Sequence, residues 1–471
     1  MKNIKKKVIM GLITCTLATT IGNEIMVTKN VYATENGHWA GYNNGYYEYN
    51  NGLRAKGWAK IDGKWYYFNE SNGYKVKNSF AIEIDKNYYY LDSDGVMQTG
   101  WKIYNGGTYH FADNGAMDIG WTKINGNWYY FSKSSGYTEN YLYKGYMKTG
   151  IQNIDNKVYY LGSNGVMQIG WINAKGDWYY FDESGDGIKG WKKINNIWYY
   201  FDKTTSVMQK GFHNIDGNTY YFDNNGAMVT GWNEIGGKWY YFYSNGVMDT
   251  GWEKINSIWY YFDNNGIMQK GLKNISDKYY YFDNNGSMVT GWNEIGGKWY
   301  YFYSNGVMDT GWEKINSIWY YFDNNGVMQK GLKNISDKYY YFEESGAAKL
   351  GWKYVNNNWY YFESDCSAAM SEWQSIGGYW YYFNSEGEMV TGGRTIGNND
   401  YYFNDNGTMR TGWVKEYFSW YYYGSNGAKK YGWQKINGSW YYLGYNGVMQ
   451  TGLSYIDGRL YYFNDNGVWR N

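Results

Sequence analysis

The chain has 471 residues with 27 Trp, 62 Tyr, 63 Gly and no Pro, and 23% of its residues are aromatic, far above the usual share in globular proteins. Its formal net charge is +1, so the composition offers no basic excess for binding nucleic acid. Length alone predicts about three domains, but a repeat would overrule that count, and so repeats are considered first.

Residues 1–33 are predicted to be a secretory signal peptide. Lysines near the start precede a mostly apolar run from Val8 to Ile21, which is too short to span a membrane, and the sequence VYA at 31–33 suits cleavage. A lipoprotein signal at Cys15 is the alternative, but Thr14 is a poor neighbour for it. Cleavage after residue 33 leaves 39 basic and 42 acidic residues, with Cys366 as the single thiol, so an internal disulfide is not expected.

The rest of the sequence is one repeat. Units begin, mostly at a Gly, near residues 37, 57, 80, 100, 120, 150, 170, 190, 211, 231, 251, 271, 291, 311, 331, 351, 372, 392, 412, 432 and 452. Sixteen of the 20 intervals are 20 residues long, and residues 231–250 recur letter for letter at 291–310. The one long insertion, Lys133 to Tyr146, is too small for a catalytic domain.

Each unit carries strand and turn signals in the same order, as residues 251–270 (GWEKINSIWYYFDNNGIMQK) illustrate. Residues 259–262 (WYYF) favour a strand, residues 263–266 (DNNG) favour a turn, and residues 267–268 favour a second short strand. The pattern predicts a β-hairpin about every 20 residues. A lone hairpin is marginally stable, whereas stacked hairpins bury their aromatic faces. We therefore expect an all-β solenoid of about 21 stacked hairpins over residues 34–471.

Strand alternation places Trp259 and Tyr261 on one face of the strand, and Tyr260 and Phe262 on the other. The sequence leaves open which face fills the stack and which lines a groove between units.

Tryptophan recurs at two fixed places. Counting each unit's opening residue as offset 0, twelve units carry Trp at offset 1 and again at offset 8, and these account for 24 of the 27 Trp. The exceptions are Trp39, Trp101 and Trp469, and most Met residues lie at offset 17. The paired Trp favour a shared role over simple core packing, because core positions usually change one residue at a time.

The pattern GWxxINGxWYYFDxNGxMxTG resembles the choline-binding, or cell-wall-binding, repeats of Gram-positive surface proteins and autolysins. The resemblance covers essentially all of residues 34–471. It implies a left-handed solenoid with about three hairpins per turn. It also implies a cage between neighbouring units, made by two Trp of one unit and a Tyr of the next and often closed by Met, whose ligand is the trimethylammonium of choline on teichoic or lipoteichoic acid.

Carried onto this sequence, the resemblance implies twelve sites, each completed by the tyrosine at offset 10 of the following unit. The expected choline-binding residues are Trp58, Trp65 and Tyr90; Trp121, Trp128 and Tyr160; Trp171, Trp178 and Tyr200; Trp191, Trp198 and Tyr221; Trp232, Trp239 and Tyr261; Trp252, Trp259 and Tyr281; Trp292, Trp299 and Tyr321; Trp312, Trp319 and Tyr341; Trp352, Trp359 and Tyr382; Trp373, Trp380 and Tyr402; Trp413, Trp420 and Tyr442; and Trp433, Trp440 and Tyr462. The unit at 100 has Thr108 in its second slot and His110 at offset 10, and no proper site is expected there.

The seven units that lack both Trp begin near residues 80, 150, 211, 271, 331, 392 and 452, which is every third unit. With three hairpins per turn these units would share one side, so we hypothesise two edges with sites and one bare edge. Duplication of a three-unit module explains the same pattern without any purpose for the bare edge.

Three functions compete on this sequence. The first is a non-catalytic, multivalent cell-wall protein that binds choline. The second is a carbohydrate-binding protein, similar to the repeats of glucosyltransferases or clostridial toxins, and the third is the targeting half of an enzyme. No nucleophile elbow, phosphate loop or zinc motif is present in the sequence, and its three His share no metal-ligand spacing. We therefore expect no enzyme activity, no cofactor, no metal, no nucleic-acid partner and no membrane span. The expected localisation is secreted, at the cell wall.

Overall fold

The computed structural model describes residues 36–43, 45–134 and 143–470. The predicted signal peptide at 1–33 and most of the insertion at 133–146 lie outside these residues. The described residues are all-β and form repeated hairpins without a helix, as the sequence predicted. No helix long and apolar enough to cross a membrane occurs in this part of the chain.

The chain divides into two compact units, Met1–Gly231 with Phe242–Met248, and Trp232–Tyr241 with Asp249–Asn471. Unit 1 holds β1 (Gly37–Ala40), β2 (Tyr46–Tyr49), β3 (Gly57–Ile61), β4 (Lys64–Phe68), β5 (Ser79–Ile84), β6 (Asn87–Leu91), β7 (Gly100–Tyr104), β8 (Gly107–Phe111), β9 (Gly120–Ile124), β10 (Asn127–Phe131), β11 (Gly150–Ile154), β12 (Lys157–Leu161), β13 (Gly170–Ala174), β14 (Asp177–Phe181), β15 (Gly190–Ile194), β16 (Ile197–Phe201), β17 (Gly211–Ile215) and β18 (Asn218–Phe222).

The strands that follow are β19 (Gly231–Ile235), β20 (Lys238–Phe242), β21 (Gly251–Ile255), β22 (Ile258–Phe262), β23 (Gly271–Ile275), β24 (Lys278–Phe282), β25 (Gly291–Ile295), β26 (Lys298–Phe302), β27 (Gly311–Ile315), β28 (Ile318–Phe322), β29 (Gly331–Ile335), β30 (Lys338–Phe342), β31 (Gly351–Val355), β32 (Asn358–Phe362), β33 (Glu372–Ile376), β34 (Tyr379–Phe383), β35 (Gly392–Ile396), β36 (Asn399–Phe403), β37 (Gly412–Glu416), β38 (Ser419–Tyr423), β39 (Gly432–Ile436), β40 (Ser439–Leu443), β41 (Gly452–Ile456), β42 (Arg459–Phe463) and β43 (Trp469–Arg470).

The main hairpin of each repeat lies earlier in the unit than the sequence suggested. In residues 251–270, β21 pairs antiparallel with β22 from Gly251 opposite Phe262 to Ile255 opposite Ile258. The two residues between them, Asn256 and Ser257, have φ of +51° and +70°, the geometry of the two-residue turns that match strand twist. The WYYF run is therefore the second strand of a hairpin whose first strand is the GWEKI sequence.

The DNNG segment forms the second turn of the unit, as predicted, but the chain after it makes a single bridge in place of a strand. Asp263 organises this turn, because its Oδ1 accepts hydrogen bonds from the backbone N–H groups of Asn265 and Ile267, both at 2.9 Å. The bridge joins Phe262 to Met268. The turn thus returns the chain to the end of its own hairpin, where it starts the next unit.

Backbone hydrogen bonds tie each 20-residue repeat to the repeat before it. The N–H of Met268 donates to the carbonyl of Trp239, which lies in the preceding hairpin, at 2.9 Å. The same bond recurs along the chain, for example from Met97 to Trp65 and from Met449 to Trp420, both at 2.8 Å. Because the residue at offset 17 bridges two hairpins, its side chain is held at the junction between them.

The core is a row of large apolar side chains at offset 11, most of them phenylalanine. Phe222, Phe262 and Phe322 are fully buried, and the same position is buried along the chain. The second tryptophans, in contrast, stay 37–48% exposed in the eleven pairs from Trp128 to Trp440, so they are not core residues. The strand face that carries the offset 11 residue is therefore the face that packs into the core of the stack.

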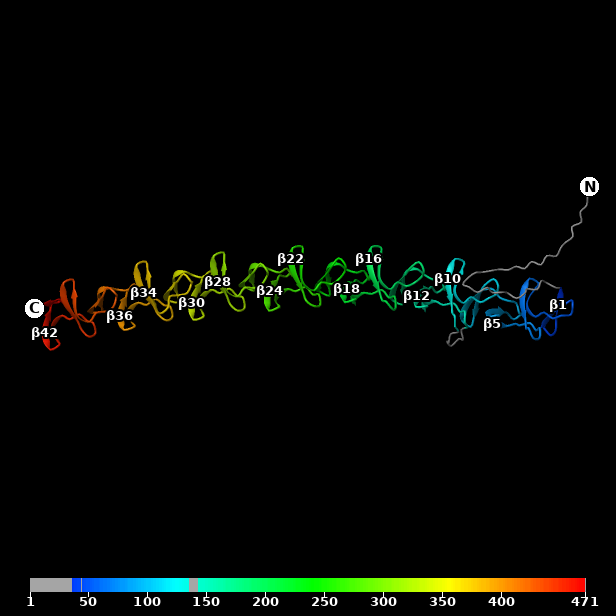
Figure 1. Cartoon of the computed structure of the whole chain (residues 1–471), viewed down its shortest axis with the longest axis horizontal. Coiled ribbons are helices and arrows are strands. Elements are labelled where there is room, and N and C mark those ends of the chain that lie inside the picture. Colours follow the sequence, from blue (N-terminus) through cyan, green and yellow to red (C-terminus); the bar gives the residue numbers. More distant parts are fainter. Residues whose placement is uncertain (1–35, 44, 135–142, 471) are drawn as a thin grey trace, which may run out of the picture. The chain divides into compact units, whose positions relative to one another are not determined.

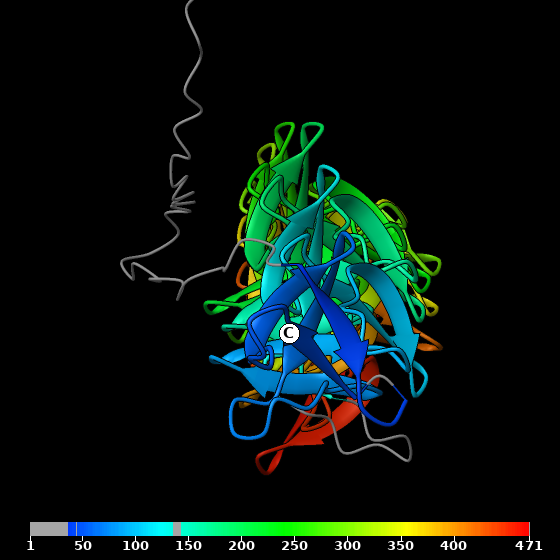
Figure 2. The same ribbon diagram turned by 90° about the vertical axis from the view of Figure 1, so that its right-hand side faces the viewer.

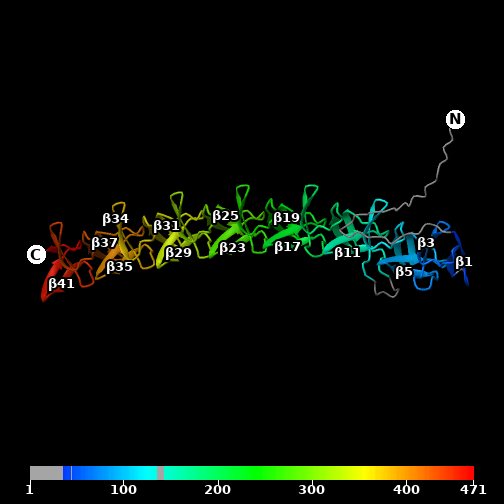
Figure 3. The same ribbon diagram turned by 45° about the vertical axis from the view of Figure 1, so that its right-hand side comes forward.

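Within unit 2, every third hairpin points in the same direction. The tips next to β22, β28 and β34 point to the same side in Figure 1. In Figure 3, β23, β29, β35 and β41 lie along the same side of unit 2. These strands open the four repeats of unit 2 that lack both Trp. The end view shows hairpins projecting in different directions (Figure 2).

Candidate aromatic pocket between hairpins

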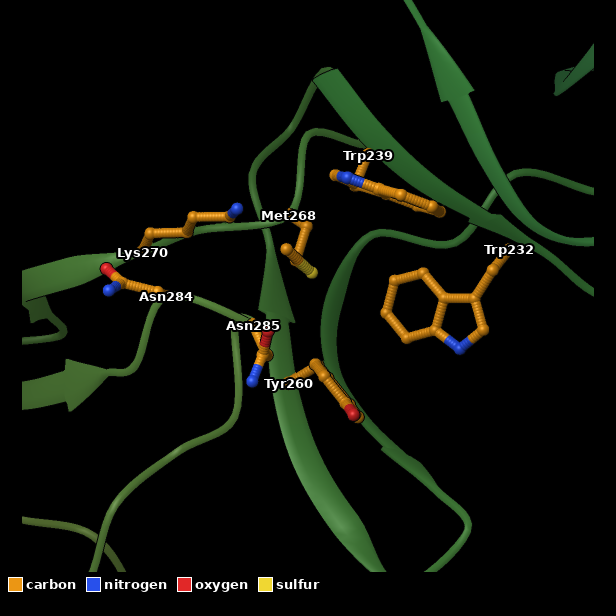
Figure 4. Close-up of a pocket in the computed structure, with 7 residues that line it drawn as sticks. All are labelled: Trp232, Trp239, Tyr260, Met268, Lys270, Asn284 and Asn285. Atoms are coloured by element: carbon orange, nitrogen blue, oxygen red, sulfur yellow. The ribbon is translucent and has the colours of Figure 1, made fainter. Parts of the chain in front are cut away.

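A pocket of about 210 Å³ lies where three successive hairpins of unit 2 meet. It is lined by Trp232, Trp239, Tyr260, Met268, Lys270, Asn284 and Asn285. Figure 4 shows the two indoles, the Tyr260 ring and Met268 arranged around a common space. A water's share of liquid volume is about 30 Å³, so the pocket suits a small organic group and falls below the usual range for drug-sized ligands.

The walls of the pocket come from defined places in the repeat. The first hairpin supplies Trp232 and Trp239, and the second supplies Tyr260 from β22 and Met268 from the connection. The turn after β24 supplies Asn284 and Asn285. Ring centroids of Trp232 and Trp239 are 6.3 Å apart at 74°, and Tyr260 lies 4.9 Å from Trp232.

The same arrangement recurs at every tryptophan pair. The first Trp of each pair lies 4.7–4.9 Å from a tyrosine at offset 9 of the following hairpin. These tyrosines are Tyr89, Tyr159, Tyr199, Tyr220, Tyr260, Tyr280, Tyr320, Tyr340, Tyr381, Tyr401, Tyr441 and Tyr461. The first Trp therefore contacts a tyrosine of the following hairpin at all twelve junctions, and nine of the pairs also have their two indoles 6.1–6.4 Å apart.

That third ring is not the tyrosine that the sequence analysis chose. The expected partners, at offset 10, were Tyr90, Tyr160, Tyr200, Tyr221, Tyr261, Tyr281, Tyr321, Tyr341, Tyr382, Tyr402, Tyr442 and Tyr462. Tyr261 instead lies 5.2 Å from Trp252, the first Trp of its own hairpin, and its ring faces Phe282 of the next hairpin.

The reason for this correction is the register of the hairpin. Trp252 is directly opposite Tyr261, so the two side chains share one face, which is turned toward the following hairpin. Tyr260 and Phe262 share the opposite face, and Trp232 of the preceding hairpin lies over both, at 4.9 and 5.6 Å. The two-residue turn at Asn256 and Ser257 sets this register, because it pairs offset 1 with offset 10 within the hairpin.

Methionine closes the pocket from the junction, as the resemblance implied. An added Cβ at Gly286 would overlap the Sδ of Met268, so this glycine of the next hairpin holds the thioether in place. Two junctions depart from this pattern. At the junction of Trp312 and Trp319, Ala348 stands in the place of Met, and its backbone N–H donates to the carbonyl of Trp319. Trp469 takes the place of Met beside Trp433, with ring centroids 5.9 Å apart.

Trp469 and the asparagine pair are site residues that sequence reasoning missed. Trp469 falls outside the paired Trp pattern, but it lies at offset 17, where the preceding unit carries Met449. The Asn-Gly runs form the turns that their chemistry predicts, and Asn284 and Asn285 also line the pocket of two hairpins earlier.

The unit at 100 matches the expectation of an incomplete site. Trp101 lies 5.0 Å from Tyr129 and 4.8 Å from His110, but Thr108 stands where the second Trp would be. His110 Nδ1 lies 2.6 Å from Asp118 Oδ2. Burial raises the pKa of the Asp118 carboxyl, and the hydrogen bond from His110 opposes this shift.

The charge beside the second tryptophan differs between junctions that are otherwise alike. Glu294 is opposite Trp299 across the hairpin, whereas Lys254 is opposite Trp259, with its Nζ 5.7 Å from that ring. A carboxylate at this place favours a cationic ligand, and an ammonium disfavours it. The junctions therefore share their Trp–Tyr contact but not their electrostatic surroundings.

Comparison with known proteins agrees with this geometry. Thirteen segments match the model of the choline-binding repeat, namely residues 38–80, 81–119, 98–138, 148–189, 188–230, 209–248, 229–268, 249–290, 289–314, 309–350, 370–395, 390–431 and 430–471, and residues 351–365 match a putative cell wall binding repeat. The hairpins and aromatic junctions define a repeat protein of the binding type. The chain belongs to the choline-binding repeat family.

Solved structures of Streptococcus pneumoniae proteins are similar over large parts of the chain. CbpJ is 29% identical over 62% of this chain and all of that chain, with a TM-score of 0.24. The modular autolysin LytC, in complex with a synthetic peptidoglycan ligand, is 25% identical over 51% of this chain and 53% of that chain, with a TM-score of 0.36.

Among curated proteins, Glucosyltransferase-S of Streptococcus mutans is 38% identical over 65 residues. This match covers 13% of the chain and only 4% of the enzyme. The repeat matches support binding to the cell wall and to choline, and association with the cell surface.

Proposed function

We propose that the chain is a secreted, non-catalytic protein that binds choline-substituted teichoic or lipoteichoic acid through its twelve Trp/Trp/Tyr junctions. The observation that carries this proposal is the pocket at Trp232, Trp239 and Tyr260, with Met268 as its fourth wall. The contact between the first Trp and the offset 9 tyrosine recurs at all the other Trp pairs, at 4.7–4.9 Å.

The chemistry of the walls selects a quaternary ammonium. Such a group has no N–H to donate, and its charge is diffuse and weakly hydrated. Aromatic faces attract it through cation–π interaction, at about 0.5–2 kcal/mol per face. Three faces and a thioether contact together supply about 4 kcal/mol, which corresponds to a Kd of about 1 mM for one site.

Weak sites become effective when many of them act on one polymer. Each engagement after the first is intramolecular, and avidity rises about 10²–10⁴-fold without any new contact. A wall polymer that carries many choline groups is the matching multivalent ligand.

The arrangement of the hairpins fits this use. We propose that within each compact unit the hairpins form a left-handed solenoid with about three hairpins per turn. The return of hairpin direction at β22, β28 and β34 supports this periodicity. The units without Trp pairs would then lie along one bare edge, supported by the common side of β23, β29, β35 and β41.

The test is retention on a tertiary-amine resin followed by elution with free choline. The proposal expects the full chain to bind and to elute at millimolar choline, and Trp359→Ala together with Trp380→Ala to elute earlier. Elution by glucan or another glycan, with no effect of choline, would contradict it.

A second candidate is glucan binding, which the match to Glucosyltransferase-S favours. Sugars stack on Trp and need directional hydrogen bonds, which Asn284 and Asn285 could supply in the pocket. Binding of dextran that free choline does not displace would favour this candidate.

A further inference from the structure

The first aromatic junction of the described chain differs from the others in what fills it. Trp39 lies 4.9 Å from Tyr66, the same contact that the paired Trp make with the next hairpin. The ammonium of Lys75 lies over this junction, with its Nζ 4.4 Å from the Trp39 ring and 5.6 Å from the Tyr66 ring. A cation from the chain itself thus occupies the place where an aromatic junction would hold a ligand cation.

Lys75 stands structurally where other units have Met. It bridges to Phe68 as Met268 bridges to Phe262, and its N–H donates to the carbonyl of Gly45 in the preceding hairpin at 2.7 Å. An added Cβ at Gly95 would lie 2.8 Å from Lys75 Cδ, so the lysine stem packs on the next hairpin as the Met side chain does.

A second lysine repeats this arrangement near the other end of the chain. Lys429 bridges to Tyr423, and its N–H donates to the carbonyl of Asp400 at 2.8 Å. Its Nζ lies 4.5 Å from the ring of Tyr421, the tyrosine at offset 9 that forms the third wall elsewhere. Lys429 also lies 5.9 Å from the ring of Tyr431, whose hydroxyl donates to Asp400 at 2.6 Å.

The two lysines share one circumstance. At both junctions the carbonyl that accepts the lysine N–H belongs to a residue other than Trp, namely Gly45 and Asp400. Wherever both tryptophans are present, the structure has Met, Ala or Trp at the bridging position. Both lysines therefore stand at junctions that lack a Trp wall, whereas other junctions of that kind have Met, Gly or Ala at the bridging position.

We infer that Lys75 and Lys429 are tethered cations that occupy two incomplete aromatic junctions and close them to external ammonium ligands. A quaternary ammonium would find only one or two aromatic faces there, worth about 0.5–2 kcal/mol each, and would compete with an ammonium that is covalently held in place. The inference rests on the proposed function for its binding consequence, but the position of the two ammonium groups is testable without any ligand.

The first experiment locates the lysine amines in the full chain. Reductive methylation with ¹³C-formaldehyde keeps each amine cationic and gives it methyl signals that are visible by NMR. Over an aromatic face, ring current shifts the methyl protons upfield. Lys148 and Lys353, whose Nζ atoms lie 4.3 and 4.4 Å from Tyr146 and Tyr341, should also give upfield signals. We expect one upfield signal to be lost in Lys75→Arg and a different one in Lys429→Arg. Signals of both lysines at the position of exposed lysines, with Lys77 as reference, would overturn the inference whether or not the chain binds choline.

The second experiment builds the same arrangement at a complete junction. The backbone N–H of Met389 donates to the carbonyl of Trp359, just as the backbone N–H of Lys75 donates to the carbonyl of Gly45. The substitution Met389→Lys should therefore place an ammonium between Trp352 and Tyr381. Site-resolved choline protection of Trp352 and Trp359 is measured by oxidative footprinting and mass spectrometry, with Met389→Gln as the uncharged control.

We expect Met389→Lys to raise the choline concentration for half-protection about tenfold relative to Met389→Gln. Equal protection in the two variants would overturn the inference. Absence of choline protection in the wild-type chain would instead remove the proposed function, and the NMR result would still decide where the lysine ammonium groups lie.

Discussion

The identity of the third aromatic wall is open to a direct test at the junction of Trp352 and Trp359, whose peptide sequence occurs once in the chain. Tyr381 lies 4.9 Å from Trp352, whereas the adjacent Tyr382 lies 5.2 Å from Trp373 in its own hairpin. Tyr381→Leu keeps an apolar side chain of similar volume and removes one aromatic face. The loss of about 1 kcal/mol from cation–π interaction should weaken choline binding at this site about fivefold.

The assay is a choline titration of the full chain, followed by oxidative footprinting of individual Trp residues. In Tyr381→Leu the half-protection concentration should rise about fivefold at Trp352 and Trp359 and stay unchanged at Trp433 and Trp440. The matched control, Tyr382→Leu, should leave Trp352 and Trp359 unaffected and alter Trp373. If Tyr382→Leu weakens protection of Trp352 and Tyr381→Leu does not, the assignment of the offset 9 tyrosine is refuted.

Three other predictions follow from the same geometry. Ala348→Met should strengthen choline protection of Trp312 and Trp319 about threefold, because it restores a thioether wall, and no gain would mean that Met does not contact the ligand. Gly286 has φ +82° and its Cβ position overlaps Met268, whereas Gly291 has φ +71° and open space around it. Gly286→Ala should therefore weaken hydrogen-exchange protection of the Met268 amide by about 1 kcal/mol more than Gly291→Ala, and equal effects would argue against that packing. Asp309 is 2% exposed, and its Oδ2 has no hydrogen-bond partner. The hydroxyl oxygen of Tyr303 lies 2.8 Å from Asp309 Oδ1 and 2.9 Å from Glu313 Oε2, and its single proton serves one carboxylate at a time. Burial raises the pKa of Asp309, so the folded state binds its proton more tightly than the unfolded state, and stability from this group is lost as pH rises through the raised pKa. Asp309→Asn should accordingly increase thermal stability most near pH 7, by about 1 kcal/mol, with the advantage vanishing at pH 4, and a gain that does not depend on pH would contradict this account.

The sequence alone determined the repeat period, the WYYF strand and the DNNG turn, but it placed the main hairpin too late in the repeat. Spacing of Gly, Trp and Tyr marked the units, and Asn and Gly marked the turns, because turn chemistry and strand alternation act within about ten residues. The paired Trp at offsets 1 and 8 pointed to a shared role for the same reason, since both belong to one hairpin. Trp359 and Trp352 could therefore be grouped without a structure.

Which residues meet across hairpins was decided by tertiary structure. The choice between Tyr260 and Tyr261 depends on which face of β22 turns toward the preceding hairpin, and a shift of one residue exchanges the two faces. The contribution of Asn284 from two hairpins later, and the ammonium of Lys75 over Trp39, arise from packing between units. Side-chain type limits what each residue can bind, but only the stacking of separate hairpins brings the walls of a pocket together.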